Sequence, residues 1–116
     1  IAADAGEIID KQGIRNQLEG GFLQSASWTL KEKVVWDQKG QLPSNWGAYP
    51  VLRFPEIPTI NVRLIDRPYL PSLGAGEAAQ GPSAGAIANA IFSAIGVRLR
   101  NTPFTPECVK KNLKLI

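Results

Sequence analysis

The residues best suited to chemistry lie in one short loop, the stretch from Leu73 to Pro82. A single carboxylate, that of Glu77, stands there among glycines and alanines. Glycine reaches backbone conformations closed to other residues and lets another molecule approach closely. A carboxylate acts as a general base when it lies within hydrogen-bond reach of the proton that it removes. The loop therefore predicts a site in which Glu77 faces a bound molecule.

The loop also fits the dinucleotide-binding pattern G-x-G-x-x-G/A, at Gly74 to Ala79. That fingerprint needs a strand running directly into the first glycine and an acidic residue about 20 positions further on. Pro68 and Pro71 separate the loop from the nearest predicted strand, and the next acid is Glu107. The context argues against a nicotinamide site. A glycine-rich turn whose acid faces water is the alternative that composition favours.

Further candidate residues lie on a predicted helix that opens after Gly13. Apolar residues at four-residue spacing indicate its buried face, namely Ile14, Leu18, Phe22 and Ala26. Gly20 and Gly21 interrupt the helix at about 1 kcal/mol each relative to Ala. A ligand or another helix packing closely would explain them equally well. Gln17 and Gln24 can each donate and accept hydrogen bonds, although both read as surface side chains on the residues alone.

The remaining elements must position these residues. A second helix is expected from Pro82 to Ile95, with Ser83 helping to cap it and Gly96 as its C-cap. Residues 31–42 predict a β-hairpin, and the alternation over Ile60 to Ile65 predicts a strand. The expected fold is α+β, with two main helices packed on one face of a small, mainly antiparallel sheet.

The composition excludes several kinds of site. Histidine is absent and Cys108 is the single cysteine, which excludes an intrachain disulfide, a usual zinc site and a Ser-His or Cys-His pair. No residue is assigned as a metal ligand. A net charge of +3 is too small and too scattered for a nucleic-acid surface. The 116 residues make one domain at most, and the absence of Met suggests part of a longer protein.

Several stretches occur in an order that is specific as a set: Gln17 to Phe22, Tyr49-Pro50, Gly74 to Glu77, Ala86 to Ile91, and Gly96 to Arg100 followed by Pro103 and Thr105 to Glu107. Together they resemble the carboxyl-terminal end of the molybdenum-binding (large) subunit of the xanthine dehydrogenase/aldehyde oxidase family. The isoquinoline 1-oxidoreductase beta-subunit type is most similar, since its loop often reads as Gly76 to Pro82 does here. Residues 1–116 are therefore expected to be the carboxyl-terminal segment of a molybdenum cofactor-binding domain.

The resemblance implies a molybdenum hydroxylase that oxidises N-heterocycles or aldehydes with water-derived oxygen. The position of Glu77 is that of the family's general base, and Gln17 matches a residue that hydrogen-bonds around the pterin or the metal's ligands. The backbone of Gly74, Ala75 and Gly76 would pass close to the cofactor. The implied cofactor is a molybdenum-pterin, in the molybdopterin cytosine dinucleotide form, and the implied partner is a small iron–sulfur subunit.

Other cofactor contacts of the family lie upstream, and nothing in this chain matches them. Asp10-Lys11-Gln12 also stands where many members carry Asn-Pro. The chain alone is therefore expected to bind no cofactor, to be inactive, and to self-associate through apolar surface that the upstream part of the subunit covers. No secretory signal occurs in the segment, which leaves the bacterial cytoplasm and periplasm both open.

Two alternatives remain from other classes of function. In the first, the chain is a packing module that completes a larger subunit, and Glu77 is a solvated acid. In the second, the chain is a small anion- or nucleotide-binding domain that uses the amino end of the second helix.

Overall fold

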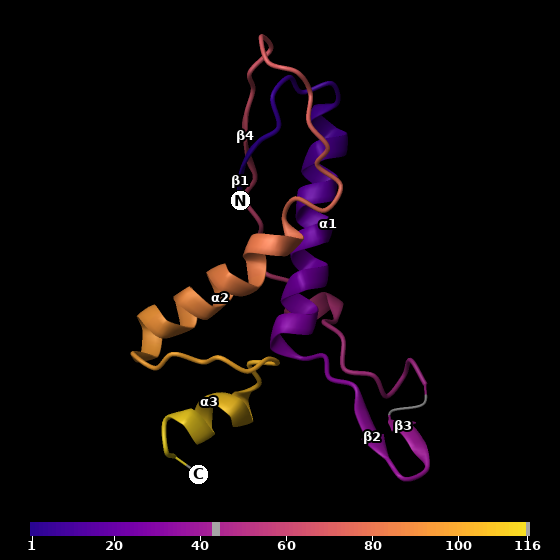
Figure 1. Ribbon diagram of the computed structural model, residues 1–116, viewed down its shortest axis with the longest axis vertical. Coiled ribbons are helices and arrows are strands. Elements are labelled where there is room, and N and C mark those ends of the chain that lie inside the picture. Colours follow the sequence, from indigo (N-terminus) through magenta and orange to yellow (C-terminus); the bar gives the residue numbers. More distant parts are fainter. Residues whose placement is uncertain (43–44, 116) are drawn as a thin grey trace.

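The structure, a computed structural model, describes residues 1–42 and 45–115. Figure 1 shows one long helix, α1, beside which the other elements are arranged. The elements in chain order are β1 (Ala2–Asp4), α1 (Lys11–Leu30), β2 (Val35–Asp37), β3 (Gly40–Leu42), the 3-10 helix η1 (Phe54–Glu56), β4 (Arg63–Ile65), α2 (Gln80–Ile95) and α3 (Pro106–Asn112). Within the described residues, no helix combines the length and apolar content that a bilayer crossing requires.

Helix α1 confirms the helix predicted near the amino end, although it begins earlier than expected. Asp10 caps it, because its Oδ1 accepts hydrogen bonds from the backbone N–H groups of Gln12 and Gly13, each at 3.0 Å. Two donors that a helix start leaves unpaired are thereby satisfied. Gly13 consequently lies inside the first turn. On the predicted apolar face, Leu18 and Ala26 are buried.

Helix α2 confirms the second predicted helix, and Gly96 is its C-cap in the left-handed conformation, with φ 70°. The helix begins at Gln80, ahead of Pro82. A proline is tolerated this early because the first N–H groups of a helix have no intrahelical partner. Ser83 is not the cap as predicted, since its hydroxyl donates back to the carbonyl oxygen of Ala79.

The prediction of a mainly antiparallel sheet is wrong. Strands β1 and β4 pair in parallel, with register from Ala2↔Arg63 to Asp4↔Ile65. The predicted hairpin forms as β2 and β3, but it is a separate two-stranded sheet. Parallel strands need a long crossover, and α1 and the hairpin both lie between β1 and β4 in the sequence. Local alternation marked the strands but could not specify this distant pairing.

The two main helices pack on each other instead of lying together on a sheet. The amino end of α2 lies against the middle of α1 (Figure 1). At Gly21 an added Cβ would lie 3.5 Å from Gln80 Cγ and 3.6 Å from Ala79 Cβ, which is ordinary van der Waals contact. An added Cβ at Gly20 would meet no atom within 4 Å. The close approach suggested by the glycine pair therefore occurs at Gly21.

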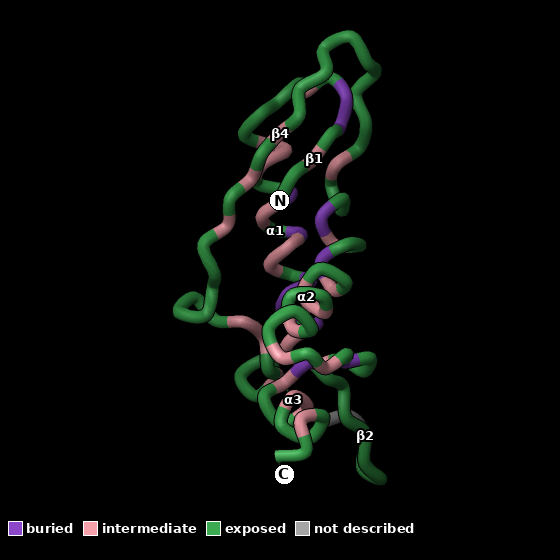
Figure 2. Tube along the Cα trace, turned by 90° about the vertical axis from the view of Figure 1, so that its left-hand side faces the viewer, coloured by how far each residue is buried: buried purple, intermediate pink, exposed green. Residues whose placement is uncertain are grey.

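The chain is extended and has little core. Its radius of gyration is 17.3 Å, against roughly 13 Å for a compact domain of this length. Figure 2 shows buried segments only along α1 and the stretches beside it. The buried apolar residues among those described are Ala5, Leu18, Ala26, Ala79, Leu99 and Phe104. Further protein is needed to complete a hydrophobic core around these elements.

Candidate functional site

A cavity of about 290 Å³ lies between the amino-terminal half of α1 and the loop that leads into α2. Its lining includes three of the predicted site residues, Gln17 from α1 and Ala75 and Gly76 from the loop. Gly74 and Glu77 are also described, but they lie outside the lining. The structure therefore brings Gln17 together with part of the loop, and places Glu77 one residue beyond the part that lines the cavity.

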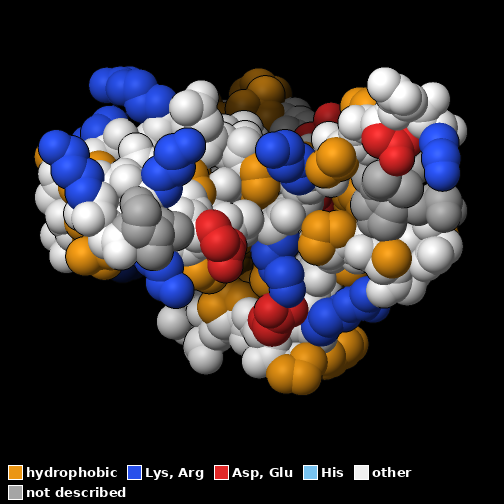
Figure 3. All heavy atoms as spheres, turned by 90° about the horizontal axis from the view of Figure 1, so that it is seen from below, with side chains coloured by type: hydrophobic (Ala, Val, Ile, Leu, Met, Phe, Trp, Pro, Cys, Tyr) orange, Lys and Arg blue, Asp and Glu red, His pale blue; other side chains and the backbone are white. Residues whose placement is uncertain are grey.

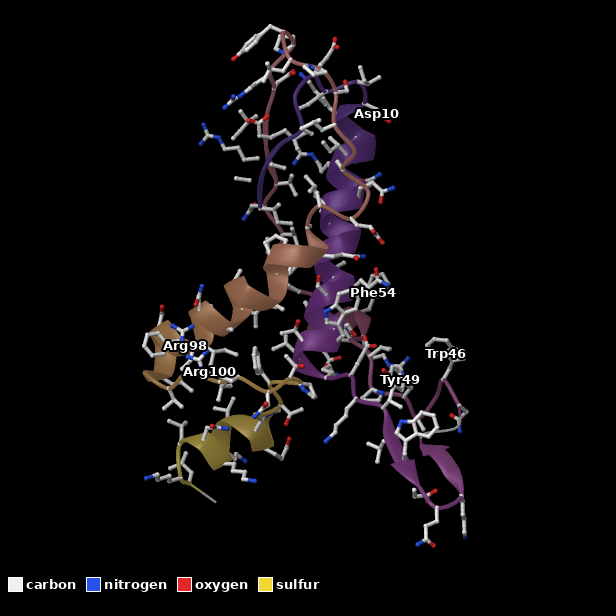
Figure 4. All side chains as sticks on the ribbon, viewed as in Figure 1. Asp10, Trp46, Tyr49, Phe54, Arg98 and Arg100 are labelled. Carbon is white, nitrogen blue, oxygen red and sulfur yellow. The ribbon has the colours of Figure 1, made fainter. Side chains whose placement is uncertain are left out.

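The α1 side of the cavity follows one face of the helix. Asp10, at the amino end of α1 (Figure 4), lines the cavity together with Gly13 and Gln17. Residues three or four apart lie on the same helix face, so Gln17 stands one turn further along than Gly13. An added Cβ at Gly13 would lie 2.6 Å from Asp10 Oδ2. Glycine at this position makes room for the capping carboxylate beside the cavity.

The loop side is tied down just ahead of its glycines. The Leu73 N–H donates to the carbonyl oxygen of Ala5 at 2.9 Å, and Ser72 Oγ donates to the carbonyl oxygen of Glu7 at 2.8 Å. Gly6 has φ +69°, and an added Cβ would lie 2.1 Å from the carbonyl oxygen of Pro71. The chain leaving β1 thus holds the start of the loop closely.

Neither Gly74 nor Gly76 is required by the packing of this chain. Their φ angles are not among the positive ones, and an added Cβ at either position would meet no atom within 4 Å. The bare face of the loop is therefore open to a molecule from outside the chain. Among the described residues, no three His, Cys, Asp or Glu side chains gather to hold a metal ion. Amide and backbone groups suit a flat organic cofactor, which need not be ligated by side chains of this segment.

Glu77 is exposed in the turn that precedes α2. Its carbonyl oxygen accepts a hydrogen bond from the Gln80 N–H at 3.1 Å, so its backbone is fixed while its side chain projects. The ion pairs of the described residues join Lys11 with Asp66, Lys31 with Glu56 and Arg67 with Asp4. None of them engages the Glu77 carboxylate.

The sequence interpretation missed two groups at this site. Glu7 is a second carboxyl-bearing residue in the lining of the cavity, and its spacing from the glycine-rich loop carried no signal. Gln80 is the second: its side-chain Nε2 donates to Gln24 Oε1 at 2.6 Å, and its carbonyl oxygen accepts from Ser25 Oγ at 3.3 Å. A polar residue immediately before a helix without charges could have indicated such an anchor.

The amino end of α2 is poorly equipped to bind an anion. The N–H group of Gln80 already donates to Glu77, and Pro82 has no N–H group. The positive end of a helix binds anions through its free N–H groups, and two of the first three positions of α2 offer none. This geometry counts against the anion- or nucleotide-binding alternative.

A second cavity, of about 370 Å³, lies on the other half of α1 and is lined by Trp28, Trp46 and Glu32 among others. Trp46 and Tyr49 lie close together near the hairpin (Figure 4), with their rings at 85° and their centroids 6.3 Å apart. Desolvation, and then the charge of Glu32 and a hydrogen bond to it, raise the pKa of Tyr49 above its ordinary value. None of the residues predicted for the site lines this cavity.

The chain matches the molybdopterin cofactor-binding domain over residues 1–58. It is 45% identical over 113 residues to the nicotinate dehydrogenase B-type subunit of Pseudomonas putida, a match that covers 97% of this chain and 10% of that protein. Identity to a membrane-bound aldehyde dehydrogenase (pyrroloquinoline-quinone) of Gluconacetobacter polyoxogenes is 33% over 114 residues, 98% of this chain and 15% of the other. The beta subunit of isoquinoline 1-oxidoreductase from Brevundimonas diminuta is 32% identical over 105 residues, 90% of this chain and 13% of that protein.

Solved structures show the same fold. Quinoline 2-oxidoreductase from Pseudomonas putida 86 superposes with a TM-score of 0.80 at 24% identity, over 97% of this chain and 15% of that one. CO dehydrogenase from Oligotropha carboxidovorans gives a TM-score of 0.81 at 18% identity, over 98% of this chain and 16% of that one. The chain therefore spans only a small part of each protein that it resembles.

Proposed function

This chain belongs to the molybdopterin cofactor-binding domain family, and on this premise we propose that residues 1–116 form the carboxyl-terminal segment of the large subunit of a molybdenum hydroxylase. Such an enzyme is an oxidoreductase that adds water-derived oxygen to an N-heterocycle or an aldehyde. Two relatives are named for N-heterocycles, nicotinate and isoquinoline, and a third is named an aldehyde dehydrogenase. These names support the substrate class.

The observation that carries the proposal is the cavity that Gln17 shares with Ala75 and Gly76. Gln17 is exposed on this side of α1, so its amide can hydrogen-bond to a cofactor in the cavity. Gly74, Ala75 and Gly76 let the loop backbone lie directly against that cofactor, since no atom of this chain covers the two glycines. The cofactor, when bound, supplies the redox chemistry, while the protein positions it and the substrate.

Glu77 is the proposed general base. A base must reach the reacting proton and must not be held by another partner. The turn at Gln80 fixes the Glu77 backbone, and no ion pair within the described part of the chain holds its carboxylate. General base catalysis contributes about 10²–10⁴-fold to a rate, which sets the expected effect of removing it.

The proposed cofactor form, molybdopterin cytosine dinucleotide, follows from the resemblance. The same holds for the proposed partners: the upstream remainder of the large subunit and a small iron–sulfur subunit that accepts the electrons. By itself the chain is expected to be inactive, because it holds only part of the site and spans 10% of its nicotinate dehydrogenase relative. Oxidation of an N-heterocycle by the purified chain with an artificial electron acceptor would contradict this expectation.

The deciding experiment is Glu77→Gln in the full-length subunit, assembled with its partner. Turnover should fall at least about 10²-fold, while the molybdenum content stays normal. Glu7→Gln is the matched control, because Glu7 lines the cavity and should change turnover only slightly. If Glu7→Gln abolishes turnover and Glu77→Gln does not, the base has been assigned to the wrong carboxylate. If neither variant loses activity, the chain is a packing module.

A further inference from the structure

The loop that carries Glu77 is fixed at both of its ends. The upstream anchor is the hydrogen bond from Leu73 to Ala5, at 2.9 Å. The downstream anchor is Gln80, which bonds to Gln24 at 2.6 Å through its side chain and accepts from Ser25 at 3.3 Å through its carbonyl oxygen. Residues 74–79 therefore form a short bridge between two fixed points, and Glu77 lies closer to the downstream one.

Gln80 reaches Glu77 directly as well as α1. Its N–H group donates to the Glu77 carbonyl oxygen at 3.1 Å, so one residue contacts both the turn of Glu77 and the helix that carries Gln17. Gly21, where no side chain intervenes, lies one turn from Gln17 on α1, and Gln80 Cγ packs over it. The backbone of the turn cannot move along α1 without breaking the bonds to Gln24 and Ser25.

We propose that Gln80 is a positioning residue, which with Gln24 and Ser25 sets the distance and direction of Glu77 relative to the face of α1 that carries Gln17. The inference rests on the proposed role of Glu77 as general base. Ser25 is fully buried and its hydroxyl also donates to the Gly21 carbonyl oxygen at 3.0 Å, so it stabilises the α1 side of the contact. Gln24 and Gln80 supply the side-chain bond that can be removed and restored.

The test uses the full-length enzyme with the variants Gln80→Leu, Gln24→Leu and the double variant Gln24→Glu/Gln80→Lys, which replaces the amide pair by an ion pair. A base displaced by about 1 Å can cost on the order of 10²-fold in rate, so kcat should fall about 10- to 100-fold in each Leu variant. KM and molybdenum content should stay unchanged. Hydrogen exchange of the peptide covering residues 73–82 should accelerate, and the ion-pair variant should recover both kcat and protection.

Gln38→Leu, an exposed glutamine in the hairpin turn, is the control and should leave kcat and exchange unchanged. The positioning role is refuted if Gln80→Leu keeps wild-type kcat and wild-type exchange while Glu77→Gln still abolishes turnover. If the Leu variants fail to assemble, the ion-pair variant decides: wild-type protection with restored kcat supports the role, and protection without recovery of kcat overturns it. If Glu77→Gln is fully active but exchange responds to Gln80, the assignment of the base fails and the anchor is purely structural.

Discussion

The crossing of α1 and α2 predicts opposite consequences for small and large substitutions at Gly21. An added Cβ would sit 3.5 Å from Gln80 Cγ and 3.6 Å from Ala79 Cβ, at ordinary contact distance. Gly21→Ala should therefore fit. It should stabilise α1 by about 1 kcal/mol, because glycine is that much less favourable than Ala in a helix interior.

A longer side chain at Gly21 has no room, because Gln80 and Ala79 already touch the position of its Cβ. Overpacking of this kind typically costs about 1–3 kcal/mol. Gly21→Leu should destabilise the crossing and displace Gln80, and with it the turn of Glu77. Turnover should then fall together with local stability.

Hydrogen exchange of α1 peptides in the full-length subunit measures this local stability. A gain of 1 kcal/mol corresponds to about fivefold slower exchange, which is the result expected for Gly21→Ala. Gly20 is the matched control in the same helix, since no atom lies within 4 Å of its missing Cβ, and Gly20→Leu should be tolerated. Faster exchange in Gly21→Ala, or equal damage from Leu at both positions, would refute the reasoning.

Three further predictions follow from single contacts. Gly76→Val should leave the fold of the full-length subunit unchanged but lower its molybdenum content, because nothing in this chain opposes the new side chain; normal content would mean that the cofactor does not approach the loop. Thr29→Val should stabilise α1 by about 1–3 kcal/mol in hydrogen exchange, since Thr29 Oγ1 is buried without a hydrogen-bond partner among the described residues; a loss of stability would reveal a partner outside this chain. Hydrogen bonds from the side chain of Lys31 hold the pKa of Glu56 below its ordinary value, so the contribution of this pair to stability is present at neutral pH and lost as the pH falls below about 4; carbon-13 NMR titration of Glu56 should show the lowered pKa, and Lys31→Met should return it toward the ordinary value.

Local signals predicted the elements of this fold well. The spacing from Ile14 to Ala26 and the glycine at position 96 identified both main helices, because side-chain periodicity and a left-handed C-cap are properties of neighbouring residues. The cap at Asp10 was missed, although Asp is a favoured N-cap, because Gly13 was taken as a break. The parallel pairing of β1 with β4 depends on residues about 60 positions apart, and no local pattern specifies such a partner.

The candidate site was predicted by two different routes. The bare loop around Glu77 was visible in the residues themselves, since glycines flank an isolated carboxylate. Gln17 looked like a surface side chain, and only the family resemblance singled it out; the cavity now places it beside Ala75 and Gly76. Glu7 and Gln80 went unnoticed, because their importance comes from contacts between segments about 55 to 65 residues apart.

Helix α2 shows why the segment depends on protein outside it. Its sixteen residues include no charged side chain, yet only Ser83 is buried, and hydrophobic side chains also lie open to solvent between the charges on the face shown in Figure 3. A helix that is apolar on all sides belongs in a protein interior. The carboxyl-terminal part of α2 must therefore be placed by the surrounding subunit, whereas its amino end is fixed by α1 through Gly21, Gln24 and Ser25. Because Glu77 lies at the fixed end, contacts within this chain set its position on α1 whatever covers the rest of the helix.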